Sequence, residues 1–453
     1  MYKCPINRDG TENNMPRFML GTTRVPHRKN TAGIQAVRIP APATVTLPMS
    51  QHIGAPAEPT VKVGDAVYVG TKVGEAQGFV SSPVYSSVSG KVKKIEPYLS
   101  SNGRSCHAVV IESDGQMTPD PSIAPPVITT LDEFICAVRE SGVVGLGGAG
   151  FPTAVKLEAE KKGIIKKIII NGAECEPYIT SDTLTMTVDS AYVKKGVETL
   201  MSFISADETV IGIESNKPRC IDEMRRVFEG NGKVRVEALP STYPQGAEKI
   251  LIYNTTGRVV SEGGLPSDVG CLVMNVTTVA FIAKYLETGM PLVEKCITVD
   301  GSAIKNPMNV IAPIGTSIEE IIQFTGGYRA DPAKVLYGGP MMGVAVYSTD
   351  YPIMKNTNAI VALSEKEAKP KEQHNCIHCG RCVSACPIGL NPTLFARAMK
   401  VGDSSERADR LTEAKIGLCI ECGCCSFVCP SARPLVETNR LAKADLRNQQ
   451  AKK

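Results

Sequence analysis

The sequence lacks three features that would assign it to a broad class at once: a long apolar run, a strong excess of one charge and an export signal. The longest apolar stretch, residues 271–283, is interrupted by Asn275, Thr277 and Thr278 and is too short to span a bilayer. With 50 basic and 46 acidic residues, the net charge of +4 argues against a nucleic-acid partner. The first 18 residues contain no apolar core of signal-peptide length. We therefore expect an intracellular protein with no membrane span of its own.

Proline, glycine and charged linkers divide the 453 residues into several predicted parts. Val-rich strands alternate with Gly turns over residues 44–112, as in lipoyl-carrier domains, but the connection at residues 77–87 has no lysine to carry a cofactor. The predicted parts are an irregular segment (1–43), a barrel-sandwich β domain (44–118), an α/β domain (127–290), a β-grasp module (291–350), a cysteine-rich domain (370–435) and a polar tail (436–453).

Sixteen cysteines are distributed unevenly along the chain. Because no export signal is present, disulfide bonds are the less favoured interpretation. Nine cysteines lie between Cys376 and Cys429, which indicates one metal-rich region. The other seven are scattered singly, as small buried apolar residues are, and comprise Cys4, Cys106, Cys136, Cys175, Cys220, Cys271 and Cys296.

One cysteine pattern occurs twice in the metal-rich region, 43 positions apart. Each copy has the form Cys-x2-Cys-x2-Cys-x3-Cys-Pro, the spacing of bacterial ferredoxins, in which the first three thiolates bind one [4Fe–4S] cluster and the fourth ligates the other. The two-residue gaps let a tight loop wrap three corners of a cubane. By this rule the first cluster takes Cys376, Cys379, Cys382 and Cys429, and the second takes Cys419, Cys422, Cys425 and Cys386.

A pair of structural zinc sites is the alternative interpretation of these cysteines. Zinc needs four ligands, usually in two x2 pairs, and has no use for a third x2-spaced cysteine or for the trailing Cys-Pro. The spacing therefore favours two iron–sulfur clusters. Cys424 falls outside the register and is interpreted as a small buried residue near a cluster. His378 is interpreted as a solvated neighbour of a ligand and not as a ligand.

The glycine run at residues 145–150 matches the dinucleotide fingerprint G-x-G-x-x-G in sequence but not in the secondary structure predicted around it. That fingerprint requires a preceding strand, whereas the preceding residues predict a helix over 131–140 with Thr130 and Glu133 as a capping box. Glycines still let backbone amides approach a phosphate or a flat ring, and the start of the next helix, predicted over 153–162, favours an anion. From the motif alone, a glycine-rich turn without a ligand stays an open alternative.

Four blocks in order carry a resemblance to a known family: "GLGGAGFPT" from residue 145, "NGAECEPY" from 171, "YPQGAEKILI" from 243 and "NVTTVAFIAKY" from 275. They resemble the FMN- and NADH-binding core of the complex I flavoprotein subunit. With the barrel-sandwich segment, the β-grasp segment and the two ferredoxin motifs, the chain is similar to the RnfC family of the Rnf ion-translocating electron-transport complexes. The resemblance runs from about Leu47 to about Pro434. It implies a multidomain α/β fold with an SLBB-type β-grasp module and an α-helical ferredoxin-like domain at its C-terminal end.

Carried onto this sequence, the resemblance implies an FMN site with an NADH site beside it. It places the carboxylates of Glu174 and Glu176 near the flavin and nicotinamide as catalytic groups, after the strand predicted over 164–170, where α/β folds bind ligands. Cys175 between them is interpreted as a packing residue. The residues implied to bind the cofactors are Gly145, Gly147, Gly148, Phe151, Asn171, Glu174, Glu176, Tyr243, Gly246, Glu248 and, near the FMN phosphate, Asn275 and Thr278.

A flavin beside two cubanes is chemically coherent, because FMN exchanges hydride with NADH and single electrons with [4Fe–4S] clusters. The resemblance thus implies a peripheral protein on the cytoplasmic face of the cell membrane that oxidises NADH, or reduces NAD, and relays electrons. Its implied partners are the membrane and iron–sulfur subunits of a translocase of EC class 7, with ferredoxin reached indirectly. Two alternatives stay open: a soluble related reductase serving a cobalamin or amino-acid reductase system, and a two-cluster electron carrier without enzymatic activity.

Overall fold

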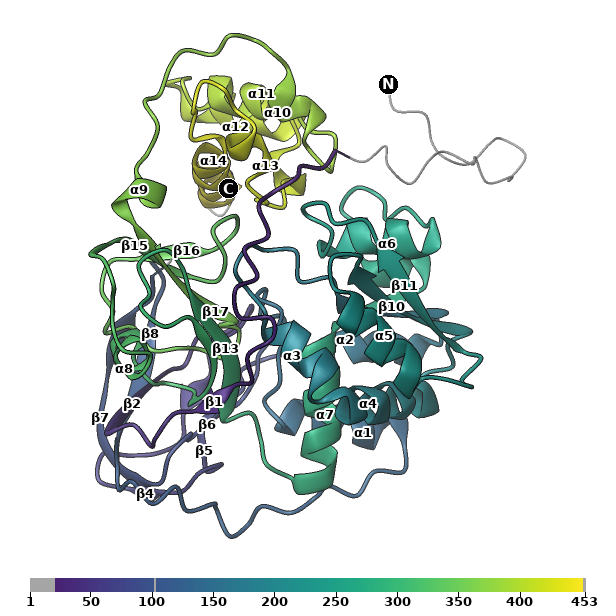
Figure 1. Ribbon diagram of the computed structural model, residues 1–453, viewed down its shortest axis with the longest axis vertical. Coiled ribbons are helices and arrows are strands. Elements are labelled where there is room, and N and C mark those ends of the chain that lie inside the picture. Colours follow the sequence, from purple (N-terminus) through teal and green to yellow (C-terminus); the bar gives the residue numbers. More distant parts are fainter. Residues whose placement is uncertain (1–20, 102, 451–453) are drawn as a thin grey trace. The chain divides into compact units, whose positions relative to one another are not determined.

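The structure is a computed structural model that describes residues 21–101 and 103–450. The chain forms two compact units (Figure 1). The first, which we call the sheet unit, contains Pro26–Ser241 and Leu265–Lys369. The second, which we call the cysteine unit, contains the described parts of Met1–Val25 and Pro370–Lys453 together with Thr242–Gly264. The α/β domain predicted over 127–290 is therefore interrupted, because residues 242–264 leave it to pack in the cysteine unit.

Seven strands of two to ten residues at the start of the sheet unit form a barrel-sandwich of antiparallel pairs. Alternate side chains of these strands, such as Val45, Leu47 and Ile111, are fully buried. The strands are β2 (Thr44–Pro48), β3 (Glu58–Pro59), β4 (Ala66–Val67), β5 (Lys72–Glu75), β6 (Val84–Tyr85), β7 (Gly90–Leu99) and β8 (Ser105–Ser113). They form two sheets, with strand orders β2-β8-β7-β4 and β3-β5-β6.

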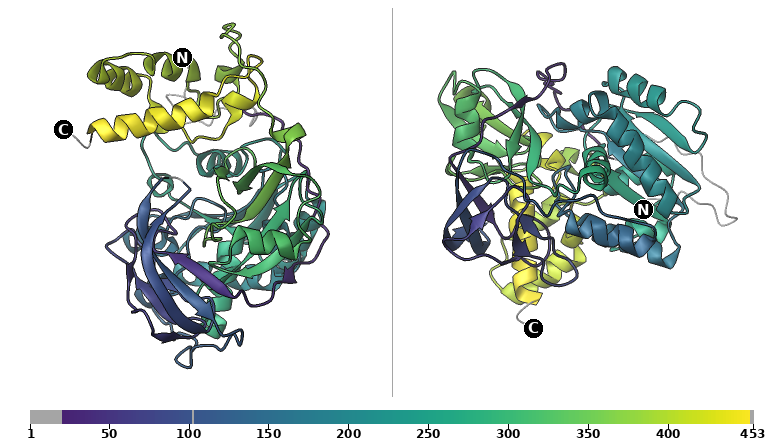
Figure 2. Two further views of the ribbon diagram at one scale, coloured as in Figure 1. Left: turned by 90° about the vertical axis from the view of Figure 1, so that its left-hand side faces the viewer. Right: turned by 90° about the horizontal axis from the view of Figure 1, so that it is seen from below.

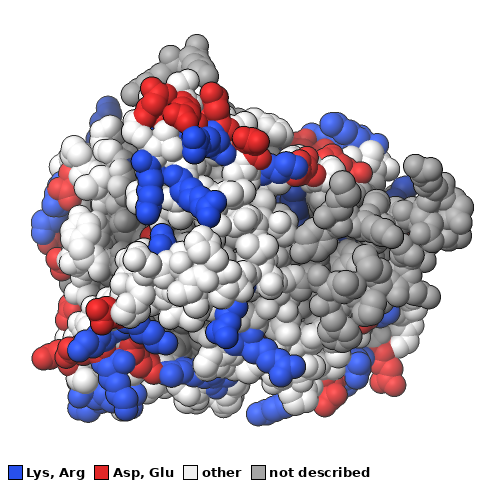
Figure 3. All heavy atoms as spheres, turned by 90° about the horizontal axis from the view of Figure 1, so that it is seen from above, with Lys and Arg blue, Asp and Glu red and all other residues white. Residues whose placement is uncertain are grey.

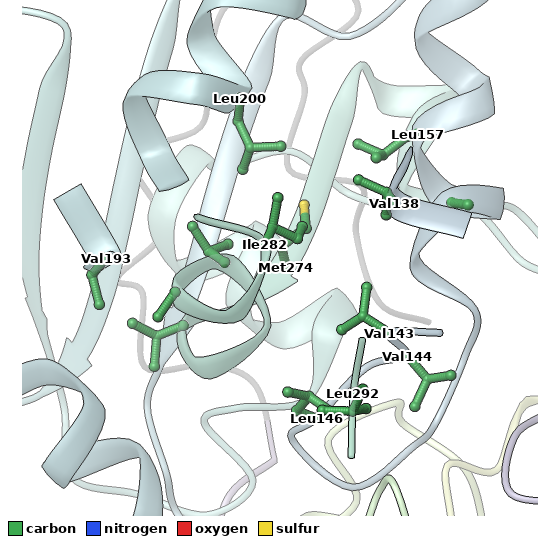
Figure 4. Close-up of a cluster of buried hydrophobic side chains, with 14 of the residues drawn as sticks. Val138, Val143, Val144, Leu146, Leu157, Val193, Leu200, Met274, Ile282 and Leu292 are labelled. Carbon is green, nitrogen blue, oxygen red and sulfur yellow. The ribbon is translucent and has the colours of Figure 1, made fainter. Parts of the chain in front are cut away.

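A four-stranded parallel sheet forms the centre of the sheet unit, in the order β11 (Val234–Leu239), β10 (Glu208–Glu214), β9 (Lys167–Gly172) and β12 (Cys271–Asn275). Strands β9, β10 and β12 are mostly buried apolar runs, which is typical of a sheet covered on both faces, whereas the edge strand β11 is mostly half-buried. Figure 4 shows part of the core, where Val138, Leu200, Met274 and Ile282 point into a shared interior. The helices around it are α1 (Leu131–Glu140), α2 (Thr153–Leu157), α3 (Ser181–Thr187), α4 (Ser190–Phe203), α5 (Pro218–Val227), α7 (Val276–Thr288) and the 3-10 helix η2 (Pro266–Val269).

The local predictions for this part hold to different degrees. Helix α1 has the predicted bounds, and Thr130 and Glu133 form the predicted capping box. The helix predicted over 153–162 is divided into α2 and the 3-10 helix η1 (Glu158–Lys162). The strand predicted over 164–170 begins later, at Lys167, because η1 ends in left-handed Gly163 and a short connection follows.

A mixed six-stranded sheet completes the sheet unit, in the order β1 (Val37–Arg38), β14 (Met308–Pro313), β13 (Glu294–Asp300), β17 (Ala359–Ser364), β15 (Pro332–Tyr337) and β16 (Val344–Val346). Helices α8 (Ile318–Phe324) and α9 (Glu365–Ala368) accompany it. Two expectations are corrected. The N-terminal segment predicted to be irregular supplies β1, which pairs in parallel with β14. The β-grasp module predicted to end at 350 needs β17, a central strand whose Ile360 and Val361 are fully buried. Residues 1–20 lie outside the described residues.

The cysteine unit is helical and packs around Phe395 and Leu411. Residues 436–453, predicted to be a polar tail, are helical up to Gln450 (Figure 2). The reason is spacing, since Leu435, Asn439 and Ala442 recur at helical intervals and are buried. No helix in residues 21–101 or 103–450 is long and apolar enough to cross a membrane. The helices are α6 (Glu248–Thr256), α10 (Arg381–Ser384), α11 (Pro392–Ala398), α12 (Ser404–Glu413), η3 (Ile416–Leu418), α13 (Cys424–Phe427) and α14 (Leu435–Gln450).

Candidate functional site

The carboxyl ends of β9 and β12 lie side by side in the sheet unit, and each strand leads into an asparagine. Asn171 and Asn275 are direct partners across the parallel ladder. The side-chain oxygen of Asn275 caps α7 by accepting the N–H groups of Thr277 at 3.0 Å and Thr278 at 3.2 Å. Open α/β sheets bind ligands outside the carboxyl ends of their strands. This edge is therefore the candidate cofactor site of the sheet unit.

The glycine loop at residues 145–150 is fixed to this edge through Leu146. The N–H of Leu146 donates to the hydroxyl of Thr278 at 3.0 Å, and the ammonium of Lys295 donates to its carbonyl at 3.3 Å. The Leu146 side chain is buried in the apolar core. A bond of 2.8 Å from the N–H of Gly145 to the carbonyl of Phe151 closes the loop. The loop is thus held in place before any ligand binds.

Gly147 presents bare backbone beside Asn275. A Cβ atom at this position would lie 2.9 Å from the side-chain nitrogen of Asn275, so a larger residue would clash. The next residue, Gly148, has a φ of +122°, which L side chains rarely adopt. Glycine at these positions lets a flat ring or a phosphate approach the backbone closely. As the sequence predicts, a helix and not a strand precedes the loop.

The carboxylates of Glu174 and Glu176 accept hydrogen bonds from nearby backbone N–H groups. The Glu174 carboxylate accepts the N–H of Asp182 at 2.7 Å, close to the start of α3. The Glu176 carboxylate accepts the N–H groups of Met341 at 3.1 Å and Met342 at 2.7 Å. Both glutamates are half-buried. The two side chains therefore fix local backbone at the site, in addition to whatever contact they make with a ligand.

The ammonium groups of two lysines donate hydrogen bonds to backbone carbonyls of the segment 171–179. The ammonium of Lys29 donates to the carbonyls of Glu174, Glu176 and Ile179 at 2.6–2.8 Å. The ammonium of Lys217 donates to the carbonyl of Ala173 at 2.7 Å. Burial lowers the pKa of Lys29. Because the ammonium groups take these carbonyls, they fix the conformation of a segment in which Glu174 has a φ of +48°.

Sequence reasoning missed two charged residues at this edge. The Asp182 carboxylate accepts the amide of Asn275 at 2.8 Å and the hydroxyl of Thr277 at 2.6 Å. Desolvation and the charge of Glu174 raise the pKa of Asp182 to about 6. Lys156 on α2 donates to the carbonyl of Val273 in β12 at 3.1 Å. Asp182 belongs to no motif, whereas Lys156 could have been found as the basic residue of the helix that follows the glycine loop.

The three residues implied to face the flavin from the block at 243–252 belong to the cysteine unit. Tyr243 is 1% exposed, and its hydroxyl donates to the carbonyl of Cys422 at 2.8 Å. Gly246 precedes α6, and Glu248 is the first residue of that helix. The structure thus brings Gly145, Gly147, Asn171, Asn275 and Thr278 to one edge of the sheet unit, and it places this block beside a cysteine loop.

Eight cysteines gather around two cavities of the cysteine unit. Each cavity is lined by one of the two sets given by the spacing, and their role as cluster ligands stays a prediction. Among the described residues, no group of three or more histidines, cysteines, aspartates or glutamates is arranged to hold a single metal ion. A cavity of about 280 Å³ is lined by Cys376, Cys379, Cys382 and Cys429, and one of about 20 Å³ by Cys386, Cys419, Cys422 and Cys425, with Cys424 beside them.

Hydrogen-bond donors point at several of these sulfur atoms. Such donors stabilise thiolates and tune the potential of a cluster. The two copies of the motif share one such bond, from the amide two residues after the first cysteine. The donors are the N–H groups of His378 to Cys376 (3.4 Å), Glu421 to Cys419 (3.4 Å) and Leu390 to Cys386 (3.3 Å), and the Asn439 amide to Cys419 (3.6 Å).

The remaining cysteines test the packing interpretation. Cys424, Cys220 and Cys271 are each 1% exposed, as expected of small buried residues. Cys136 is exposed, so that interpretation is wrong there, because Cys136 lies on the outer face of α1. Cys106, Cys175 and Cys296 are half-buried, and Cys4 lies outside the described residues. His378 is exposed beside its cysteine, as expected.

Four protein families match successive parts of the chain. In order they are the RnfC barrel-sandwich hybrid domain (residues 17–116), the Nuo51 FMN-binding domain (138–284), the SLBB domain (296–345) and the 4Fe–4S dicluster domain (372–433). The chain thus combines an FMN-binding domain with a domain for two iron–sulfur clusters, and its cofactors are FMN and iron–sulfur clusters.

Curated relatives match most of this chain. The chain is 44% identical to the C subunit of the Na(+)-translocating ferredoxin:NAD(+) oxidoreductase complex of Acetobacterium woodii, over 83% of this chain and 86% of the relative. It is 42% identical to the C subunit of the proton-translocating complex of Clostridium ljungdahlii, over 82% and 81%. The C subunit of an ion-translocating oxidoreductase complex of Rhodobacter capsulatus is 35% identical, over 94% and 82%. Among solved structures, an NAD+-reducing [NiFe]-hydrogenase in the H2-reduced state is 18% identical with a TM-score of 0.49, over 70% of this chain and 63% of that one.

Proposed function

Because the chain belongs to the RnfC family, the C subunits of ion-translocating ferredoxin:NAD(+) oxidoreductase complexes, we propose that it is the subunit that exchanges electrons with NADH. That it is an electron-transfer subunit follows from the family, its FMN-binding domain and its dicluster domain. FMN, when bound, exchanges two electrons with a nicotinamide and single electrons with iron–sulfur clusters. The observation that carries the proposal is that one chain has both a strand edge suited to a flat cofactor and two cavities, each lined by one of the predicted sets of four cysteines.

The residues at the strand edge have distinct proposed tasks. Gly147 and Gly148 let FMN lie against bare backbone, and Asn171 offers its amide at the end of β9. Glu174 and Glu176 are proposed to serve the reaction by fixing the backbone that faces the cofactors, since their carboxylates accept backbone N–H groups. Phe151, Gly145 and Thr278 shape and hold the loop.

The eight cysteines are proposed to hold the two clusters in the sets that line the two cavities. The other subunits of the complex are proposed to move the ion, as in a translocase of EC class 7, and to connect this chain with ferredoxin. We place the chain at the cytoplasmic face of the membrane, attached through protein contacts. This assignment is supported by the names of the relatives and by the lack of a membrane-crossing helix in the described residues.

The proposal is tested on the full chain, purified without oxygen and assayed for flavin and iron before and after addition of NADH. We expect FMN, about eight iron atoms per chain, and bleaching of both chromophores by NADH. Gly147→Ala should lower the flavin content, because the added Cβ meets Asn275. Gly232→Ala is the matched control, since nothing lies within 4 Å of its added Cβ. Two clusters without flavin and without NADH-dependent bleaching would instead identify a simple electron carrier.

A further inference from the structure

The two copies of the cysteine motif, residues 376–387 and 419–430, have the same backbone. Gly380 and Gly423 occupy the same place in each copy, with φ values of 74° and 80°, and each begins a four-residue helix. In each copy the amide two residues after the first cysteine donates to its sulfur at 3.4 Å. Because the backbones match, any difference in what covers the two copies comes from their side chains and neighbours.

The second copy is covered by its own chain. Tyr243 lies against it, its hydroxyl donating to the carbonyl of Cys422 at 2.8 Å. The thiol of Cys424 donates to the carbonyl of Tyr243 across 3.8 Å. As a result Cys422 is 8% exposed and Cys424 is 1% exposed. The adjoining cavity is small, about 20 Å³.

The equivalent positions of the first copy are open. Cys379 corresponds to Cys422 and is exposed, and Arg381 corresponds to Cys424 and is also exposed. Ile377 is 66% exposed, and Leu394 at the edge of the same cavity is 42% exposed. The cavity of about 280 Å³ beside them is larger than that of the second copy. A cluster ligand, apolar side chains and an arginine thus share one open face, which we call the Cys379 face.

Among the residues that the structure describes, the charged side chains of the Cys379 face are basic. Arg397 and Arg433 line its cavity, and no aspartate or glutamate does. Within the described residues, no carboxylate lies within ion-pair distance of Arg381, Arg397 or Arg433. The second copy differs, because the acidic residue lining its cavity, Glu421, is paired with Lys443 at 2.7 Å. On the face seen in Figure 3, basic and acidic side chains lie partly in groups of one sign and partly intermixed.

We propose that the Cys379 face is the docking surface for an acidic electron-transfer protein, which there takes the place that Tyr243 occupies on the second copy. Carboxylates around the partner's redox centre would pair with the three arginines, and Ile377 and Leu394 would supply the apolar centre of the contact. Cys376, Cys379, Cys382 and Cys429 would hold a cluster at this face, and that cluster would exchange one electron with the partner's centre, one being oxidised as the other is reduced, with no bond made or broken. The proposal uses the iron–sulfur domain and requires neither NADH nor flavin.

The test is the binding of a labelled acidic two-cluster bacterial ferredoxin, used as a probe with the charge and the redox centre of the proposed partner and not as the natural partner itself, to the full chain at low and high ionic strength. We expect salt-sensitive binding, and Arg381→Glu with Arg397→Glu should weaken it about tenfold or more at low salt. Arg447→Glu is the matched control, an exposed arginine on α14 outside both cavities, and should leave binding unchanged. Electron transfer from the dithionite-reduced ferredoxin to the oxidised chain should slow in parallel in stopped-flow measurements.

A second variant protects the test against misfolding. Ile377→Asp changes a side chain that is mostly in solvent and adds a negative charge to the face, so it should weaken binding while the iron content stays unchanged. Binding that is insensitive to all three substitutions would overturn the proposal. So would tighter binding of the basic protein cytochrome c than of the ferredoxin. A chain that binds the ferredoxin as expected but shows no NADH-dependent bleaching would contradict the proposed function alone.

Discussion

The hydroxyl of Tyr243 donates a 2.8 Å hydrogen bond to the carbonyl of Cys422, a residue 179 positions further along the chain. The backbone of Tyr243 also pairs with Thr23, each N–H donating to the other's carbonyl at 2.8–2.9 Å. One buried tyrosine therefore ties together three segments that are distant in sequence. The cysteine loop at 419–430 takes its shape from these tertiary contacts as well as from its motif.

Tyr243→Phe should weaken the packing around this loop. The ring keeps its buried place, but the Cys422 carbonyl loses its donor, which costs about 1–3 kcal/mol for a buried polar group. We expect a lower midpoint of chemical unfolding and a change in the electron paramagnetic resonance signal of the second cluster. Tyr347→Phe, at a tyrosine that is 78% exposed, is the control. Identical behaviour of the two variants would contradict this prediction.

Cys424→Ser should leave both clusters in place. The residue lies outside the ligand register, and a serine hydroxyl can donate to the Tyr243 carbonyl as the thiol does. The expected iron content is unchanged, whereas Cys422→Ser should lose one cluster. Iron and sulfide assays of the two variants decide the matter. Loss of a cluster from Cys424→Ser would show that the proposed ligand set is wrong.

Lys29→Met should loosen the segment that carries Glu174 and Glu176. Removal of the ammonium takes one donor from each of three carbonyls, of which that of Glu174 keeps the Lys217 ammonium at 3.3 Å, with an expected loss of roughly 1–3 kcal/mol in the free energy of unfolding. Flavin affinity should fall as well, because the segment borders the candidate site. The exposed Lys62→Met is the matched control in a fluorescence titration with FMN. Unchanged affinity and stability would exclude this role for Lys29.

Asp182 should make stability depend on pH. Its pKa is raised from 3.8 to about 6, so between these values the folded protein binds more protons than the unfolded chain. The free energy of unfolding should therefore decrease as the pH rises through this window, by at most about 3 kcal/mol. Asp182→Asn removes the titration and should flatten the dependence in urea titrations. The exposed Asp331→Asn should keep the wild-type slope. Equal slopes in all three proteins would refute the assignment.

The sequence was most informative where chemistry fixes the spacing of residues. The ferredoxin motif identifies two cysteine sets, and the structure gathers those sets around two cavities. The capping box of α1 is equally local, since Thr130 and Glu133 bond to each other's backbone and Glu133 also bonds to the neighbouring Thr129. The contacts of the capping box lie within a short segment, and the spacing of the cysteines follows a strict geometric rule.

Contacts between distant segments could not be predicted in this way. Lys29 sits in a segment that carries no periodic pattern, yet it holds a loop about 145 positions away. Asp182 acquires its raised pKa from burial and from Glu174, and neither is visible in one dimension. The helix over the C-terminal residues was missed because only a few apolar side chains mark its buried face. Tertiary packing decides all three.

The excursion of residues 242–264 into the cysteine unit has a consequence for how this chain can be divided. A fragment that stops at Lys369 would keep Tyr243 but lose Cys422 and Cys424, the groups that bond to it. Such a fragment would carry an exposed tyrosine and the helix α6 without the unit they pack in. The cluster region therefore does not form a unit without residues 242–264, and exchanging it between relatives would require these residues to be exchanged with it.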